Sequence, residues 1–167
     1  MFLDESGCNT DMTRRYAYSL GGSRTVDSAP LSKPKNTTIL SSIQLDGTLR
    51  YTTFSGGTTV ERFKRYLETD LLPHLNGNSV LIMDNMKSHH AKAVKNLLDS
   101  SEIRYISLPP YSPDLNPIEK LWSKVKSFLR KFKARTLDAL PNAIQNAFHS
   151  VTVSDCSGWF RFCGYAL

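Results

Sequence analysis

The chain has 167 residues, which fits one domain able to bury a sizeable core without a disulfide scaffold. Its hydrophobic fraction of 40% and charged fraction of 22% are ordinary for a globular protein, and its formal charge of +6 favours a polyanionic partner. The sequence has no apolar run long enough to span a membrane and no signal peptide, and its three scattered cysteines indicate free thiols in a cytoplasmic setting.

The predicted elements alternate between strands and helices along the chain. The first half predicts a short strand over 1–4, a second over 15–20, a hairpin around Asp46-Gly47, and a helix begun by the capping box Thr58-x-x-Glu61. Patterning in the second half predicts strands over 79–84 and 103–108, helices near 91–98, 117–132 and 138–150, and an apolar tail, 152–167, that docks on the body. We therefore expect an α/β fold, with a mixed sheet flanked by helices in a single domain over 1–167.

Three acidic residues fall at positions where an isolated charge is costly. Asp4 and Asp84 each end an apolar run, and Glu119 lies just inside the helix opened by Asn116-Pro117. Carboxylates that converge from separate segments are the ligands that Mg²⁺ or Mn²⁺ prefers, and two such ions can support in-line displacement at phosphorus. We expect Asp4, Asp84 and Glu119 to be catalytic metal ligands, in a site poorly organised until the metal binds.

Each acid also has a purely structural interpretation. Glu5 competes with Asp4, because neighbouring side chains of a strand point to opposite faces. Asp84 would serve as a helix cap, and Glu119 occupies the position of a capping-box glutamate. Taken singly the structural interpretations are favoured, whereas the three together favour a metal site.

Two further features have candidate roles in binding. His89 follows Asp84 closely and is assigned to support of a metal ligand or to phosphate contact, with a surface histidine as the close alternative. Basic residues crowd the helix over 117–132 opposite its apolar stripe, and we expect them to follow a DNA backbone, although a solvated helix face is the common alternative. These DNA-binding candidates are Lys120, Lys124, Lys126, Arg130 and Lys131.

Three motifs together resemble one known family. The motifs are Phe2-Leu3-Asp4-Glu5-Ser6-Gly7, Leu81-Ile82-Met83-Asp84-Asn85 with His89, and Pro110-Tyr111-Ser112-Pro113-Asp114-Leu115-Asn116-Pro117-Ile118-Glu119. They resemble the DDE catalytic domain of Tc/mariner-type insertion-sequence transposases, and the 34 residues between Asp84 and Glu119 (85–118) match the spacing of that family. The third motif is the most specific of the three.

The resemblance implies a ribonuclease H-like fold, two Mg²⁺ or Mn²⁺ ions, and cut-and-paste DNA transposition. Asn85 and His89 match accompanying positions of the motifs, which implies that they support a metal ligand or contact DNA. The resemblance also implies as partners the ends of the element and target DNA, a homodimer in the DNA complex, and a DNA-binding half that is separately encoded. Nothing precedes Met1 here, so a helix-turn-helix region is expected to be absent and the first strand to be short. The alternatives are a catalytically silent fragment that binds DNA or full-length transposase, and a nuclease acting on RNA–DNA hybrids.

Overall fold

The computed structural model describes residues 1–14, 16–31 and 34–165. A five-stranded mixed sheet forms its centre, in the order β3-β2-β1-β4-β5. β1 pairs antiparallel with β2 and parallel with β4, while β2–β3 is antiparallel and β4–β5 is parallel. The strands are β1 (Phe2–Cys8), β2 (Thr37–Ile43), β3 (Leu49–Ser55), β4 (Val80–Met83) and β5 (Arg104–Ser107).

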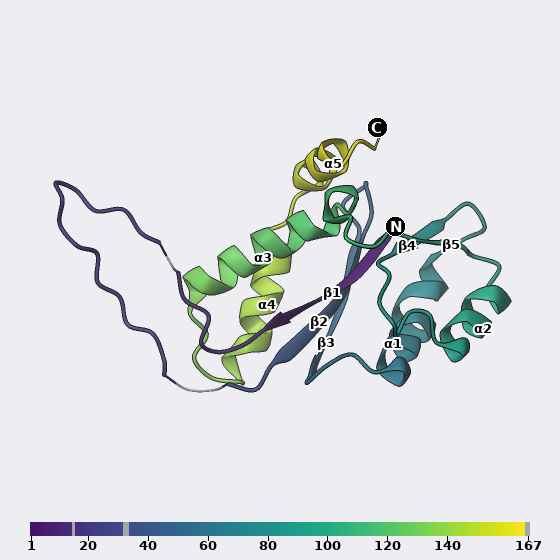
Figure 1. Ribbon diagram of the computed structural model, residues 1–167, viewed down its shortest axis with the longest axis horizontal. Coiled ribbons are helices and arrows are strands. Elements are labelled where there is room, and N and C mark those ends of the chain that lie inside the picture. Colours follow the sequence, from purple (N-terminus) through teal and green to yellow (C-terminus); the bar gives the residue numbers. More distant parts are fainter. Residues whose placement is uncertain (15, 32–33, 166–167) are drawn as a thin grey trace.

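Helices cover both faces of this sheet (Figure 1). α1 and α2 lie on one side, and α3 and α4 lie on the other, with α5 beside the first turns of α3. The helices are α1 (Val60–Tyr66), α2 (Lys92–Ser100), α3 (Ile118–Phe132), α4 (Ala139–His149) and α5 (Val153–Phe162). A π-helical turn, η1 (Leu67–Leu71), and two 3₁₀ turns, η2 (Leu72–His74) and η3 (Pro113–Leu115), complete the helical elements of the described residues.

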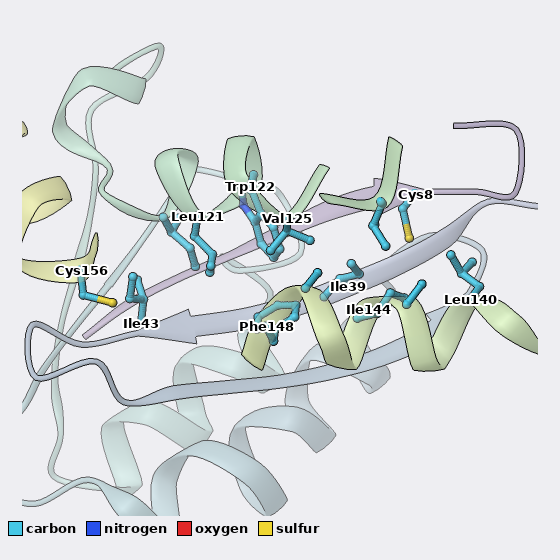
Figure 2. Close-up of a cluster of buried hydrophobic side chains, with 14 of the residues drawn as sticks. Cys8, Ile39, Ile43, Leu121, Trp122, Val125, Leu140, Ile144, Phe148 and Cys156 are labelled. Atoms are coloured by element: carbon cyan, nitrogen blue, oxygen red, sulfur yellow. The ribbon is translucent and has the colours of Figure 1, made fainter. Parts of the chain in front are cut away.

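Alternation along β1 divides the core into two clusters. Phe2 packs with residues of α3, α4 and α5, whereas Leu3 packs with residues of α1, η1 and α2. Figure 2 shows the first cluster, in which Trp122 and Val125 of α3 face the sheet. The same alternation directs Asp4 toward α3 and Glu5 toward α1.

The Asp46-Gly47 hairpin is confirmed. The Gln44 amide donates to the Thr48 carbonyl at 3.0 Å, and Gly47 has a positive φ of 87°. A Cβ on Gly47 would lie 2.9 Å from Cγ2 of Val153, so this turn also allows α5 to approach closely. Glycine is therefore required here for both backbone conformation and packing.

Two expectations about the N-terminal region are wrong. β1 is not a four-residue remnant, because all of its residues from Phe2 to Cys8 pair with β2. Asp4 accordingly lies in the middle of a strand and not at its end. Residues 16–20 form no strand; they belong to the segment between β1 and β2 that extends away from the body, and residue 15 lies outside the described residues (Figure 1).

Local helix signals are partly confirmed. Thr59, and not Thr58, caps α1, since its side chain accepts a hydrogen bond from the Arg62 amide at 3.3 Å. Residues 153–162 of the predicted tail form α5, which docks through the buried Cys156 and Phe160. Within the described residues, no helix is both long and apolar enough to cross a membrane.

Candidate active site

The three predicted acids line one cleft beside the central strand. Asp4 comes from the middle of β1, Asp84 directly follows β4, and Glu119 lies in the first turn of α3. Leu3 pairs with Met83, so the β1–β4 register brings Asp4 and Asp84 to the same level of the sheet. The cleft has a volume of about 400 Å³.

Asp4 is a buried carboxylate with uncompensated charge. Its side chain accepts hydrogen bonds from the Glu5 amide at 2.7 Å and from Nε1 of Trp122 at 3.1 Å, and it is only 6% exposed. Burial raises the pKa of Asp4 to about 7; the hydrogen bonds oppose this shift, and the charges of Asp84 and Glu119 add to it. Trp122 was expected only to pack, since no sequence pattern shows where an indole N–H will point.

Asp84 is held by a histidine from its own loop. Nδ1 of His89 lies 2.8 Å from Oδ1 of Asp84, and the Met86 amide donates to the same oxygen at 3.2 Å. Burial works to raise the pKa of Asp84, but the hydrogen bond and charge of His89 outweigh it, so the net pKa is lowered. Asp84 therefore does not cap α2, whose first residue, Lys92, lies well beyond it.

Asn85 and His89 occupy different positions around Asp84. Asn85 lines the cleft, where its Oδ1 contacts Nε2 of His90. His89 is buried behind Asp84, so it supports that residue and does not face the cleft as a DNA contact would.

Glu119 is not part of a capping box. Pro117 occupies the cap position of α3 without a side-chain hydrogen bond, and the Glu119 amide donates to the Asn116 carbonyl at 3.1 Å. The Glu119 side chain is therefore free to face the cleft. Asn116, also lining the cleft, has a buried Oδ1 that receives no hydrogen bond from the described residues.

The cleft has the chemical character of a site for a hard divalent cation. It combines three carboxylates with the orphaned amide oxygen of Asn116, and Asp4 bears an unfavourable charge that a cation would neutralise. Across residues 1–14, 16–31 and 34–165, no three acidic, histidine or cysteine side chains stand close enough together to enclose a metal ion. The acids thus share a cleft without forming a closed ligand set.

The basic residues of α3 separate into two groups. Lys120, Lys124 and Lys131 line a groove between α3 and α5, where Ser123 and Ser127 also contribute hydroxyl groups. Lys124 Nζ lies 2.5 Å from Oδ2 of Asp155, and Lys120 Nζ lies 3.8 Å from the centre of the Phe162 ring.

The remaining two predicted DNA contacts do not line this groove. Arg130 lines a neighbouring hollow with Tyr16 and Tyr18, which adjoins the groove at Ser127. The charge of Lys126 acts on Cys8, partly opposing the burial that raises the pKa of that thiol to about 11.

Carboxylates gathered in one cleft are the kind of ligand that divalent metals use when they support displacement at phosphorus. The chain belongs to the DDE superfamily endonuclease family, whose profile matches residues 1–141. The relatives and solved structures to which it is similar are transposases, in agreement with the resemblance to the DDE catalytic domains of Tc/mariner-type transposases.

The curated relatives are transposases of nematodes. The chain is 28% identical over 97 residues to the transposable element Tc1 transposase of Caenorhabditis elegans, and 29% identical over 75 residues to the Tcb2 transposase of Caenorhabditis briggsae. These matches cover 56% and 45% of this chain but only 36% and 28% of the relatives. The chain thus spans about a third of the length of these proteins.

Solved structures of Mos1 transposase share the fold. The paired-end complex with the left transposon end matches with a TM-score of 0.78 at 18% identity, covering 96% of this chain and 50% of that one. The strand transfer complex matches with a TM-score of 0.76, also at 18% identity, over 96% of this chain and 50% of that one. The ribonuclease H-like fold is therefore confirmed.

Proposed function

We propose that this chain is the catalytic portion of a transposase, which cleaves DNA at the ends of a mobile element and joins those ends to target DNA. The observation that carries the proposal is the convergence of Asp4, Asp84 and Glu119 on one cleft from three distant segments. Family membership supports the reaction class, and the Mos1 complexes with transposon ends support DNA as the substrate.

In this proposal the three acids hold divalent metal. Mos1 structures include paired-end complexes with Mn and with Mg, which supports one of these ions here. Asp4, Asp84 and Glu119 are the proposed ligands, with Asn85 at the rim of the cleft and His89 supporting Asp84 from behind. When bound, a pair of such ions would activate the attacking oxygen and stabilise the leaving oxygen of the scissile phosphodiester.

The groove between α3 and α5 is the proposed path for the DNA backbone. Lys120 directly follows Glu119 in the first turn of α3, so the groove starts at the same end of this helix as the cleft. Lysine ammonium groups and serine hydroxyls contact phosphate without reading the base sequence. We therefore restrict the DNA-backbone contacts to Lys120, Lys124 and Lys131, and we place Lys126 and Arg130 outside this path.

Strand cleavage tests the proposal directly. The substrate is a supercoiled plasmid carrying the genomic DNA that flanks the coding sequence, with Mg²⁺ or Mn²⁺ as the metal. We expect the chain to nick this plasmid, and Asp84→Asn and Glu119→Gln to reduce nicking to background, since each removes a charged ligand while keeping the shape of the side chain.

Glu68→Gln is the matched control, because Glu68 is an exposed acid paired with Lys64 and remote from the cleft. It should nick as the unaltered chain does. Equal activity of the Asp84→Asn variant, or binding to the flanking DNA without any metal-dependent nicking, would overturn the proposal in favour of a silent DNA-binding fragment.

A further inference from the structure

Glu5 is a largely buried acid on the face of the sheet opposite the cleft. Its side chain is 10% exposed, and its Oε2 lies 3.3 Å from Nε2 of His89. Its other oxygen, Oε1, is buried and accepts no hydrogen bond from the described part of the chain. A carboxylate in such a position is costly to folding unless it interacts with an opposite charge.

His89 connects this acid to the candidate active site. The imidazole is fully buried, its Nε2 faces Glu5, and its Nδ1 lies 2.8 Å from Oδ1 of Asp84. The ring also stacks on Phe63 of α1, with centroids 4.1 Å apart and planes inclined by 23°. Both ring nitrogens and one ring face are therefore engaged, which leaves the imidazole a single orientation.

These contacts link fixed parts of the fold to an acid on a loop. Glu5 is held in β1 by paired backbone, and Phe63 is fully buried in α1, so both are fixed parts of the fold. Asp84 instead lies in the irregular segment after β4, and its side chain is 37% exposed. The contacts thus run from rigid groups, through the imidazole, to the one acid of the cleft that lies on a loop.

We propose that Glu5 is a positioning residue which, through His89, fixes the Asp84 carboxylate in the orientation needed to hold metal. The inference rests on the proposed function, because it gives Asp84 the role of a metal ligand. It assigns Asp4 and Glu5 to opposite sides of one strand with complementary tasks, the first facing the cleft and the second orienting a residue of the neighbouring strand's loop. Partners that orient a metal ligand typically change metal affinity by about 10–100-fold when removed.

The alternative is that Glu5 and His89 only stabilise the fold by satisfying each other. That role predicts a loss of thermal stability with no change in metal affinity at temperatures where the variant is folded. A positioning role predicts weaker metal binding by a chain that is still folded, and an effect of Glu5 that depends on His89. Metal affinity in a double-mutant cycle therefore separates the two roles.

The experiment measures binding of Mn²⁺ alone to the chain by electron paramagnetic resonance of the free ion. We expect Glu5→Gln to weaken Mn²⁺ binding by about ten-fold with an unchanged circular dichroism spectrum. In a His89→Gln background, the same Glu5 substitution should have no further effect. Glu61→Gln, which removes an exposed acid from the first turn of α1, is the matched control and should bind Mn²⁺ as the unaltered chain does.

Glu5→Asp provides a second variant if Glu5→Gln does not fold. It retains the charge but withdraws it from His89 by one methylene, so the same weakening of Mn²⁺ binding is expected. Unaltered Mn²⁺ affinity in a folded Glu5 variant, or equal losses in the presence and absence of His89, would overturn the positioning role while leaving the proposed function intact. Absence of Mn²⁺ binding and of nicking in the unaltered chain would overturn both.

Discussion

At the scale of single residues, the two aspartates of the cleft differ in how readily they ionise. Asp4 is buried among other acids, and no cationic side chain of the described residues is paired with it, so its ionised form is disfavoured in the metal-free fold. Asp84 is ionised more readily because His89 lies against it. The two carboxylates therefore have different protonation behaviour although the β1–β4 pairing brings them together.

The raised pKa of Asp4 predicts how stability depends on pH. The folded-state pKa is about 7, whereas an unfolded chain's aspartate titrates near 3.9. Between about pH 4 and pH 7 the folded state binds more protons, so the contribution of Asp4 to the free energy of unfolding falls as the pH rises through this range. Asp4→Asn keeps the shape but cannot ionise, and it should be more stable than the unaltered chain at pH 8 by a few kcal/mol.

The measurement is urea unfolding with a chelator present, at pH 5 and pH 8. The difference in stability between Asp4→Asn and the unaltered chain should be smaller at pH 5 than at pH 8, and added Mn²⁺ should reduce it at pH 8 by favouring ionised Asp4. A difference that does not change with pH would show that Asp4 is not protonated in the metal-free fold.

Features within one segment of the chain could be predicted from the sequence, whereas contacts between distant segments could not. Asp4 and Asp84 were singled out because each ends an apolar run, and Glu119 because it ends the most specific of the three motifs. The contact between Glu5 and His89 was not found, because residues so far apart in the chain meet only through the β1 register and the packing of α1. Glu5 was considered as an alternative to Asp4 for the metal site. In the structure Asp4 lines the cleft and Glu5 contacts His89 on the opposite face of the same strand.

At the scale of elements, helix signals were read more accurately than strand signals. The apolar stripe of α3 was predicted correctly from Ile118 to Leu129, because a helix closes its own hydrogen bonds and its periodicity spans several turns, but Phe132 at its end is exposed. The predicted first strand ended too early because Ser6-Gly7-Cys8 has weak strand propensity. In the structure, pairing with β2 overrides this preference. Residues 16–20 have good strand propensity, but they pair with no described strand because they lie away from the sheet.

α5 depends on its capping box. Oγ1 of Thr152 accepts from the Asp155 amide at 3.1 Å, while Oδ2 of Asp155 accepts from the Thr152 amide at 2.8 Å. Removing such a cap typically costs about 1 kcal/mol. Thr152→Ala should therefore lower the free energy of unfolding by about 1 kcal/mol in urea titrations, and Thr152→Ser should restore most of it.

Ser154→Ala is the control for the cap, because Ser154 lies exposed in the same first turn and does not cap the helix. Its effect should be within a few tenths of a kcal/mol. Equal losses for Thr152→Ala and Ser154→Ala would mean that α5 is held by its packing on Phe2 and not by its cap.

At the scale of the whole molecule, the charges that sum to +6 are unevenly distributed. Three acids, Asp4, Asp84 and Glu119, line the cleft, while Lys120, Lys124 and Lys131 line a separate groove along α3. DNA lying along the groove would present a scissile phosphate to the acids while lysines neutralise neighbouring phosphates.

The salt dependence of DNA binding tests this arrangement. Each phosphate contact contributes about −0.9 to the slope of log affinity against log salt concentration. Lys120→Gln combined with Lys131→Gln should thus make the slope for duplex DNA shallower by about 2, whatever the base sequence, as measured by fluorescence anisotropy over a range of salt concentrations. Lys124 is left in place because its ion pair with Asp155 already offsets part of its charge.

The control removes the same charge from the opposite side of the molecule. Lys92 and Lys95 are exposed on α2, which packs on the other face of the sheet. Replacing both with glutamine lowers the net charge equally, so any effect of overall charge appears in both double variants. If the two slopes change alike, DNA is attracted by the charge of the molecule as a whole. If only the α3 variant changes, Lys120 and Lys131 contact the DNA backbone in the groove.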